Sequence, residues 1–181
     1  MNWKKELNEF EENEKWPEAI DLLQEVIDRD PDNKDAYIRM IYLLHNILVD
    51  QDYSKTILMH NYLEALLAKY FHESYLKYSS DSEYLFFIGT IMHIAEWYFG
   101  QKDESLALSL QKRAMELEPD NALFRYGYLF SAESDKAELN DLANEIVYVS
   151  KYPQWAESKG YPGRYVMGLV RTQIGLPWDG P

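Results

Sequence analysis

The sequence predicts an all-α protein built from antiparallel helical hairpins, and three observations carry this prediction. Apolar residues recur at spacings of three and four along most of the 181 residues. No segment shows the sustained alternation of apolar and polar residues that is typical of a β-strand. The tripeptide Pro-Asp-Asn ends an acidic, apolar run twice, at residues 31–33 and 119–121. Because proline cannot continue a helix and asparagine can cap the next one, each copy predicts a hairpin boundary.

The first hairpin covers the N-terminal residues. Residues 3–13 carry apolar side chains on one helical face, and a second helix begins with Pro17 in its first turn. That helix must end before Pro31, which lacks an N–H group. Asp32 or Asn33 is then available to cap the following helix.

The second hairpin is unusually long. Its apolar spacing predicts helices over residues 35–49 and 54–78, and the sequence SSDSE after them breaks the pattern and supplies a cap. Residues 84–99 are apolar on nearly every side, which predicts a helix covered by neighbours on both flanks and ended by Gly100.

The remaining helices are predicted from the same signals. An amphipathic helix over residues 103–118 runs into the second Pro-Asp-Asn, and residues 121–133 and 135–148 form a further pair. The composition then changes to aromatic, Gly and Pro residues in the tail, 151–181, for which one last helix over 163–174 is expected. The chain is thus predicted to hold about nine helices.

Two segments resemble the tetratricopeptide repeat (TPR), a 34-residue helix-turn-helix unit with small, aromatic and proline residues at set positions. The matching residues are Trp3, Phe10, Ala19 and Pro31 in the first segment, and Ala95, Tyr98, Ala107, Ala114 and Pro119 in the second. The resemblance implies that residues 1–150 form a right-handed α-solenoid, with residues 151–181 as a C-terminal cap of the same domain. The second hairpin holds about 20 residues more than the repeat allows. Other hairpin arrays, such as HEAT-like repeats or an irregular bundle, remain alternatives.

Composition restricts the classes of partner. The formal charge is −13, and residues 1–35 hold twelve acidic against five basic residues. Such a field repels nucleic acid and anionic membrane and favours a basic protein partner, although it also serves solubility alone. The absence of cysteine excludes disulfides, thiolate metal sites and cysteine nucleophiles. Without a recognisable leader or membrane span, a cytoplasmic protein is expected.

The resemblance to TPR proteins implies that a partner peptide binds along the concave face of the array. Lys4 and Asn8 match two positions of a clamp for a terminal carboxylate, but Arg39 stands where a second asparagine is expected. The concave face is instead predicted to present Tyr42, Asn46, His93, Glu96, Tyr126 and Phe130. Packing between hairpins is the alternative role for the aromatic members of this set.

No pattern in the sequence indicates an enzyme. His93 and Glu96 are three residues apart and would share a helix face, as in di-iron bundles, but no second matching motif occurs. Phosphate-binding loops, nucleophile elbows and calcium loops are also missing. We therefore predict no catalytic residues, no metal and no cofactor.

Two non-enzymatic functions follow as hypotheses, with an enzyme that uses His93 and Glu96 in a helical pocket as the outside alternative. The first is a non-enzymatic protein-protein interaction module that binds a partner protein or peptide in the helical groove. The second is an acidic inhibitor, comparable to a bacterial immunity protein that neutralises a basic toxin domain. In that case acidic residues would mimic phosphate, namely Glu9, Glu11, Glu12, Glu14 and Glu18. The aromatic tail either caps the array or adds an interface patch.

Overall fold

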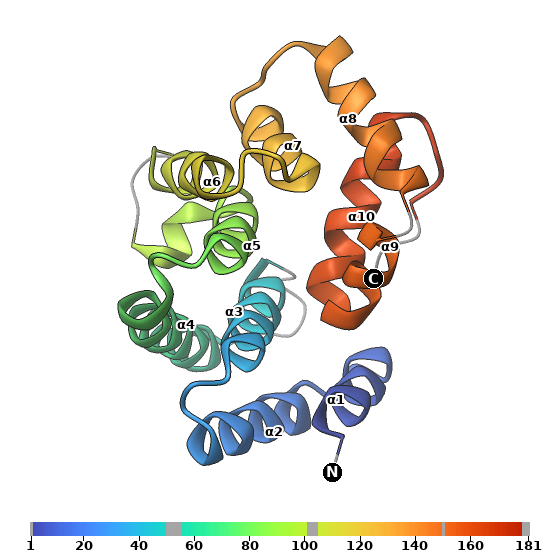
Figure 1. Ribbon diagram of the computed structural model, residues 1–181. Coiled ribbons are helices and arrows are strands. Elements are labelled where there is room, and N and C mark those ends of the chain that lie inside the picture. Colours follow the sequence, from blue (N-terminus) through green and yellow to red (C-terminus); the bar gives the residue numbers. More distant parts are fainter. Residues whose placement is uncertain (1, 50–55, 101–104, 150, 179–181) are drawn as a thin grey trace. The chain divides into compact units, whose positions relative to one another are not determined.

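The computed structural model describes residues 2–49, 56–100, 105–149 and 151–178 (Figure 1). Within these ranges the chain forms ten α-helices and one 3-10 helix and contains no strand, which confirms the all-α prediction. The chain divides into two compact units. The first comprises Met1–Ser79 and Ala95–Lys102, and the second comprises Ser80–Ile94 and Asp103–Pro181.

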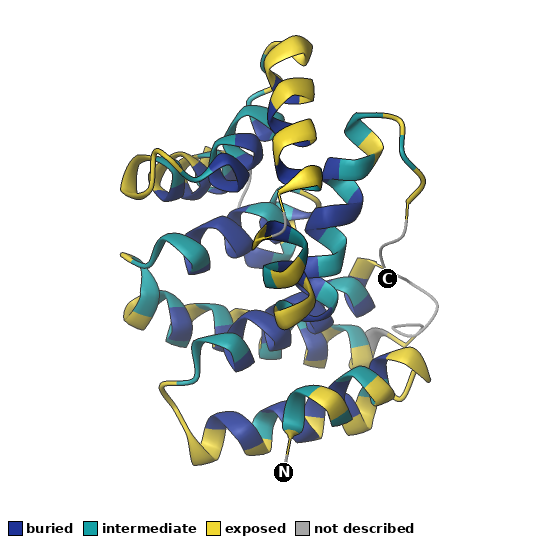
Figure 2. Ribbon diagram, turned by 45° about the vertical axis from the view of Figure 1, so that its right-hand side comes forward, coloured by how far each residue is buried: buried dark blue, intermediate teal, exposed yellow. Residues whose placement is uncertain are grey.

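The first unit consists of the N-terminal helices and the 3-10 helix. Its elements are α1 (Trp3–Glu12), α2 (Trp16–Arg29), α3 (Lys34–Val49), α4 (Ile57–Tyr78) and η1 (Glu96–Phe99). Each α-helix packs on the next, and η1 packs on α4. Figure 2 shows how buried and exposed residues separate onto opposite faces of α2, as its amphipathic pattern predicts. The predicted start of the fourth helix at Ser54 lies outside the described residues.

The second unit contains the remaining six α-helices. They are α5 (Ser82–Met92), α6 (Ser105–Leu117), α7 (Ala122–Ser131), α8 (Lys136–Tyr148), α9 (Lys151–Lys159) and α10 (Tyr161–Gln173). Consecutive helices pack on one another, and α5 also packs on α7 and α8 on α10. Helix α9 was not predicted, because Pro153 lies within it and Gly160 follows it directly. Pro153 and Pro162 lie in the first turns of α9 and α10, where the missing N–H costs no helical hydrogen bond.

Both copies of Pro-Asp-Asn have the predicted role. The Oδ1 atom of Asn33 accepts a hydrogen bond from the N–H of Ala36 at 3.1 Å, at the start of α3. The Oδ1 atom of Asn121 accepts one from the N–H of Leu123 at 3.2 Å, at the start of α7. In each copy the proline follows the end of a helix and the asparagine caps the next one.

The single helix predicted over residues 84–99 is wrong. Helix α5 ends at Met92, Ala95 has a non-helical φ of −155°, and η1 follows. The hydroxyl of Tyr98 donates to the carbonyl oxygen of Leu48 at 3.0 Å, and the Phe99 ring meets that of Phe71 at a centroid distance of 5.3 Å. Tyr98 and Phe99 of η1 therefore pack against the first unit instead of extending α5, whereas Trp97 is exposed. Gly100 ends η1 with a φ of 72°, so the predicted stop is confirmed.

A buried ion pair connects α1 and α3. The guanidinium of Arg39 donates to the carboxylate of Glu11, and the two side chains are 3% and 2% exposed. Arg39 also donates to the side-chain oxygen of Asn8 at 2.8 Å, and Lys4 pairs with Asp35. The clamp positions Lys4 and Asn8 are thus engaged within the unit. Glu11 was wrongly predicted to be part of an exposed phosphate-mimicking surface, because it is needed to neutralise a buried cation.

Replacement of Arg39 by methionine tests this ion pair. Arg39→Met is expected to lower the free energy of unfolding by about 3–5 kcal/mol, because the Glu11 carboxylate stays buried without the guanidinium. The double variant Arg39→Met/Glu11→Leu is expected to recover most of the loss. Urea unfolding followed by circular dichroism measures both, with the exposed Lys5→Met as the control. A loss below about 1 kcal/mol for Arg39→Met would contradict the role of the pair.

Candidate functional site

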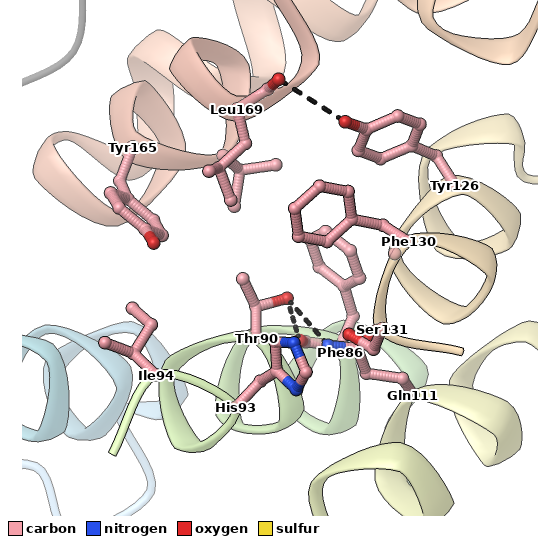
Figure 3. Close-up of a pocket in the computed structure, with 12 residues that line it drawn as sticks. Phe86, Thr90, His93, Ile94, Gln111, Tyr126, Phe130, Ser131, Tyr165 and Leu169 are labelled. Carbon is pink, nitrogen blue, oxygen red and sulfur yellow. Dashed lines mark hydrogen bonds between the residues drawn. The ribbon is translucent and has the colours of Figure 1, made fainter. Parts of the chain in front are cut away.

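The second unit contains a cavity of about 160 Å³, called here the α7–α10 pocket (Figure 3). Residues of α5, α6, α7 and α10 line it. Its walls are largely apolar and include Phe86, Phe130, Val166 and Leu169. Thr90, Gln111 and Ser131 provide polar groups along one side, called here the polar floor. The pocket therefore combines an apolar interior with a few placed hydrogen-bonding groups, as ligand sites commonly do.

Two glycines bring the helices of the pocket close together. A Cβ atom on Gly89 of α5 would lie 2.6 Å from Cγ of Gln111, and one on Gly127 of α7 would lie 2.6 Å from the ring of Phe86. Neither distance is compatible with a side chain unless the neighbours shift. The glycines thus allow α5, α6 and α7 to approach closely around Gln111, which is 1% exposed.

Hydrogen bonds hold the polar floor in place. The hydroxyl of Ser131 donates to Oε1 of Gln111 at 3.0 Å, and Nε2 of Gln111 lies 3.5 Å from Oγ1 of Thr90. The hydroxyl of Thr90 donates to the carbonyl oxygen of Phe86 at 2.8 Å. None of the three floor residues was predicted as a site residue. Their side chains meet because α5, α6 and α7 pack together, and no local sequence pattern indicates this contact.

The structure brings three of the six predicted partner-binding residues into this pocket. His93, Tyr126 and Phe130 all line it. The rings of Tyr126 and Phe130 stack at a centroid distance of 5.8 Å, and His93 meets Phe130 edge-on at 6.5 Å. The hydroxyl of Tyr126 donates to the carbonyl oxygen of Leu169 at 3.3 Å and ties α7 to α10. Burial raises the pKa of Tyr126, so its phenol stays neutral at physiological pH.

The other three predicted residues belong to the first unit. Tyr42 is 3% exposed in the middle of α3, so its ring is part of the core rather than of an accessible groove. Asn46 and Glu96 are partly exposed, on α3 and η1. Because α5 ends before His93, the spacing between His93 and Glu96 does not define a shared helix face, and that interpretation is corrected.

The lining of the pocket is poor in ionisable side chains. Among the described residues that line it, none is Asp, Glu, Lys or Arg. Among the described residues no cluster of three or more potential metal-ligating side chains occurs. Over the same ranges, no helix has both the length and the apolar run needed to cross a membrane.

Aromatic residues of the tail pack back onto the second unit. The Trp155 ring stacks on Phe87 at 5.3 Å, and its Nε1–H donates to Oε1 of Glu83 at 2.8 Å. The hydroxyl of Tyr152 accepts a hydrogen bond from the N–H of Ala122 at 3.1 Å, at the start of α7. These two side chains therefore serve internal contacts, whereas Tyr165 lines the pocket.

In the first unit, His45 is a titratable group with a shifted pKa. The side chain is fully buried, with its ring stacked on Phe99 at 5.8 Å and edge-on to Tyr98 at 6.3 Å. Burial lowers the pKa of His45 to about 4, and the neighbouring Asn46 side chain acts in the opposite direction. The folded state therefore requires a neutral imidazole.

This shift predicts a pH dependence of stability. The unfolded state binds a proton at His45 near pH 6.5 and the folded state only near pH 4, so stability is lost as the pH falls between these values. Through His45, the unmodified protein is expected to lose about 2 kcal/mol of unfolding free energy between pH 7 and pH 5. The His45→Phe variant is expected to lack this part of the loss. Urea unfolding at several pH values measures it, with the exposed His72→Gln as the control. An equal pH dependence in His45→Phe and the unmodified protein would contradict the assignment.

Searches against protein-family models, curated proteins and solved structures yield no match to this sequence or fold.

Proposed function

We propose that the chain is a non-enzymatic protein-binding module, a divergent TPR-like array of helical hairpins. In this proposal the α7–α10 pocket receives a side chain of a partner protein. The observation that carries the proposal is the pocket itself, an apolar cavity without charged side chains in its lining. Interfaces are anchored by a few side chains buried in such pockets.

The chemistry of the pocket favours binding over catalysis. Its polar floor offers an amide and two hydroxyls, and these groups already hydrogen-bond to one another or to the backbone. Tyr126 is engaged with the backbone of α10 and remains neutral near pH 7. None of these groups is arranged as a nucleophile with an adjacent base. Such a site can hold a group by shape and hydrogen bonding.

Filling the pocket tests the proposal. Leu169 is partly exposed on α10 and lines the pocket, so Leu169→Trp is expected to fill the cavity with little effect on folding. Used as bait in host lysate, Leu169→Trp should lose a protein that the unmodified chain captures, with affinity reduced at least about tenfold. Thr172→Trp places the same ring on the exposed side of the same helix and should retain the protein. Equal capture by all three baits would count against the pocket as the binding site.

A second candidate function, the acidic inhibitor of a basic toxin domain, is supported by the surface of α1 and α2. Among the exposed residues between Asn2 and Asp32, nine are acidic and three are basic. Such an excess attracts a basic protein over long range and raises the rate of association at low salt. It is a separate surface from the α7–α10 pocket, so the two functions require different residues.

Reversing acidic charges on α2 distinguishes the inhibitor function from binding through the α7–α10 pocket. Glu18→Lys/Asp21→Lys on α2 is expected to slow association with a captured basic partner about tenfold or more at 50 mM salt and much less at 500 mM. Asp141→Lys/Glu145→Lys on α8 changes the net charge equally and is the matched control. Stopped-flow or surface-plasmon kinetics give the rates. Equal slowing by both double variants would show that only net charge matters and would eliminate α1 and α2 as the inhibitor surface.

A further inference from the structure

We propose that the occupant of the α7–α10 pocket is a phenol ring, supplied by a tyrosine side chain of the partner protein. This inference rests on the proposed function and specifies the chemistry of the group that binds. It follows from the volume of the cavity, the lack of Asp, Glu, Lys and Arg among the described residues of its lining, and the hydrogen-bonding capacity of its polar floor.

The volume of the pocket matches one aromatic ring. The cavity measures about 160 Å³. An apolar cavity of about 150 Å³ is known to be large enough to bind benzene. A single six-membered ring therefore fits, whereas the two fused rings of an indole would require the walls to move. The aromatic side chains of Phe86 and Phe130 and the ring of His93 in the lining favour an aromatic occupant, because ring pairs gain energy beyond the area they bury.

The polar floor leaves hydrogen-bonding capacity for a hydroxyl group. The amide nitrogen of Gln111 carries two hydrogens, and its one contact on the floor is the 3.5 Å approach to Thr90. The oxygen of Ser131 donates its hydrogen to Gln111 and keeps its lone pairs. A phenol oxygen at the floor can accept from the Gln111 amide and donate to Ser131. A phenylalanine ring could form neither of these additional hydrogen bonds, so it should bind more weakly than a phenol.

The lining also disfavours charged rings of similar size. Among the described residues that line the pocket, none carries a carboxylate, ammonium or guanidinium group. An ionised occupant would lose its hydration without gaining the opposite charge of such a group. Phenol, with a pKa near 10, remains neutral at physiological pH. Among side chains that end in a single ring, tyrosine thus satisfies the size, polarity and charge of this site.

Binding of side-chain analogues tests the proposal directly. The full chain is titrated at pH 7.5 with p-cresol, toluene and 4-methylbenzoate, and binding is followed by ¹H–¹⁵N NMR. We expect saturable binding of p-cresol, about fivefold or more weaker binding of toluene, and no saturation with 4-methylbenzoate. Leu169→Trp should abolish binding of p-cresol, and Thr172→Trp should leave it unchanged.

A second variant isolates the hydroxyl. Ser131→Ala keeps the cavity but removes the acceptor, so p-cresol should lose most of its advantage over toluene while toluene binds as before. Retained toluene binding shows that the variant still forms the pocket. Equal affinity of p-cresol and toluene for the unmodified chain would overturn the assignment of a phenol.

Competition with the captured protein identifies the source of the ring. Saturating p-cresol should release the protein that the unmodified chain captures, as expected when both occupy the pocket. Binding of p-cresol without release overturns a tyrosine of the partner as the source. If no analogue binds but Leu169→Trp still abolishes capture, the phenol is overturned and the protein-binding function survives with another occupant.

Discussion

The close approach of α5, α6 and α7 is the constraint on which the second unit depends. It exists because Gly89 and Gly127 present no Cβ atom to Gln111 and Phe86. The short helix separation brings the Gln111 amide within reach of Ser131 and Thr90, which come from different helices. With larger residues at either glycine, the helices would move apart and the polar floor would lose its hydrogen bonds. The lack of a Cβ atom at Gly89 and Gly127 thus determines both the packing of these helices and which polar groups line the pocket.

The two units bury polar groups in different ways. In the first unit, Arg39 and Glu11 form a charged pair that is almost completely removed from water. Such a pair cannot be separated without leaving a charge in a medium of low polarity, so it holds α1 against α3. In the second unit, the polar floor of the pocket consists of the Gln111 amide and the hydroxyls of Thr90 and Ser131. Neutral groups exchange hydrogen-bond partners at a smaller cost, which suits reversible binding.

The aromatic tail contributes to both packing and the candidate site. Tyr152 and Trp155 hydrogen-bond and stack within the second unit, and Tyr165 and Leu169 of α10 line the pocket. Two roles were considered for the tail, a cap of the array and an interface patch. Neighbouring residues of this one segment make internal contacts and line the candidate site. In the proposed function, α10 closes the pocket from one side and the hydroxyl of Tyr126 keeps that helix next to α7. The acidic surface of α1 and α2 belongs to the other unit and is independent of this arrangement.

Features that depend on a few adjacent residues were determined by the sequence alone. Asn33 and Asn121 cap the helices that follow them, because capping joins atoms only two or three residues apart. The all-α class and the long helices α3 and α4 follow in the same way from apolar spacing. His93, Tyr126 and Phe130 were predicted as binding residues, but the sequence placed them on a common groove with Tyr42, which is buried in the core of the first unit.

Only the tertiary structure decided where residues 84–99 divide and which residues share the pocket. The break after Met92 occurs because Tyr98 and Phe99 pack on helices about 50 and 30 residues earlier in the chain. The polar floor likewise joins Thr90, Gln111 and Ser131, which are separated by about 20 residues each. Local patterns report which face of a helix is apolar, but not which distant side chain covers it, because that choice depends on the packing energy of the whole unit.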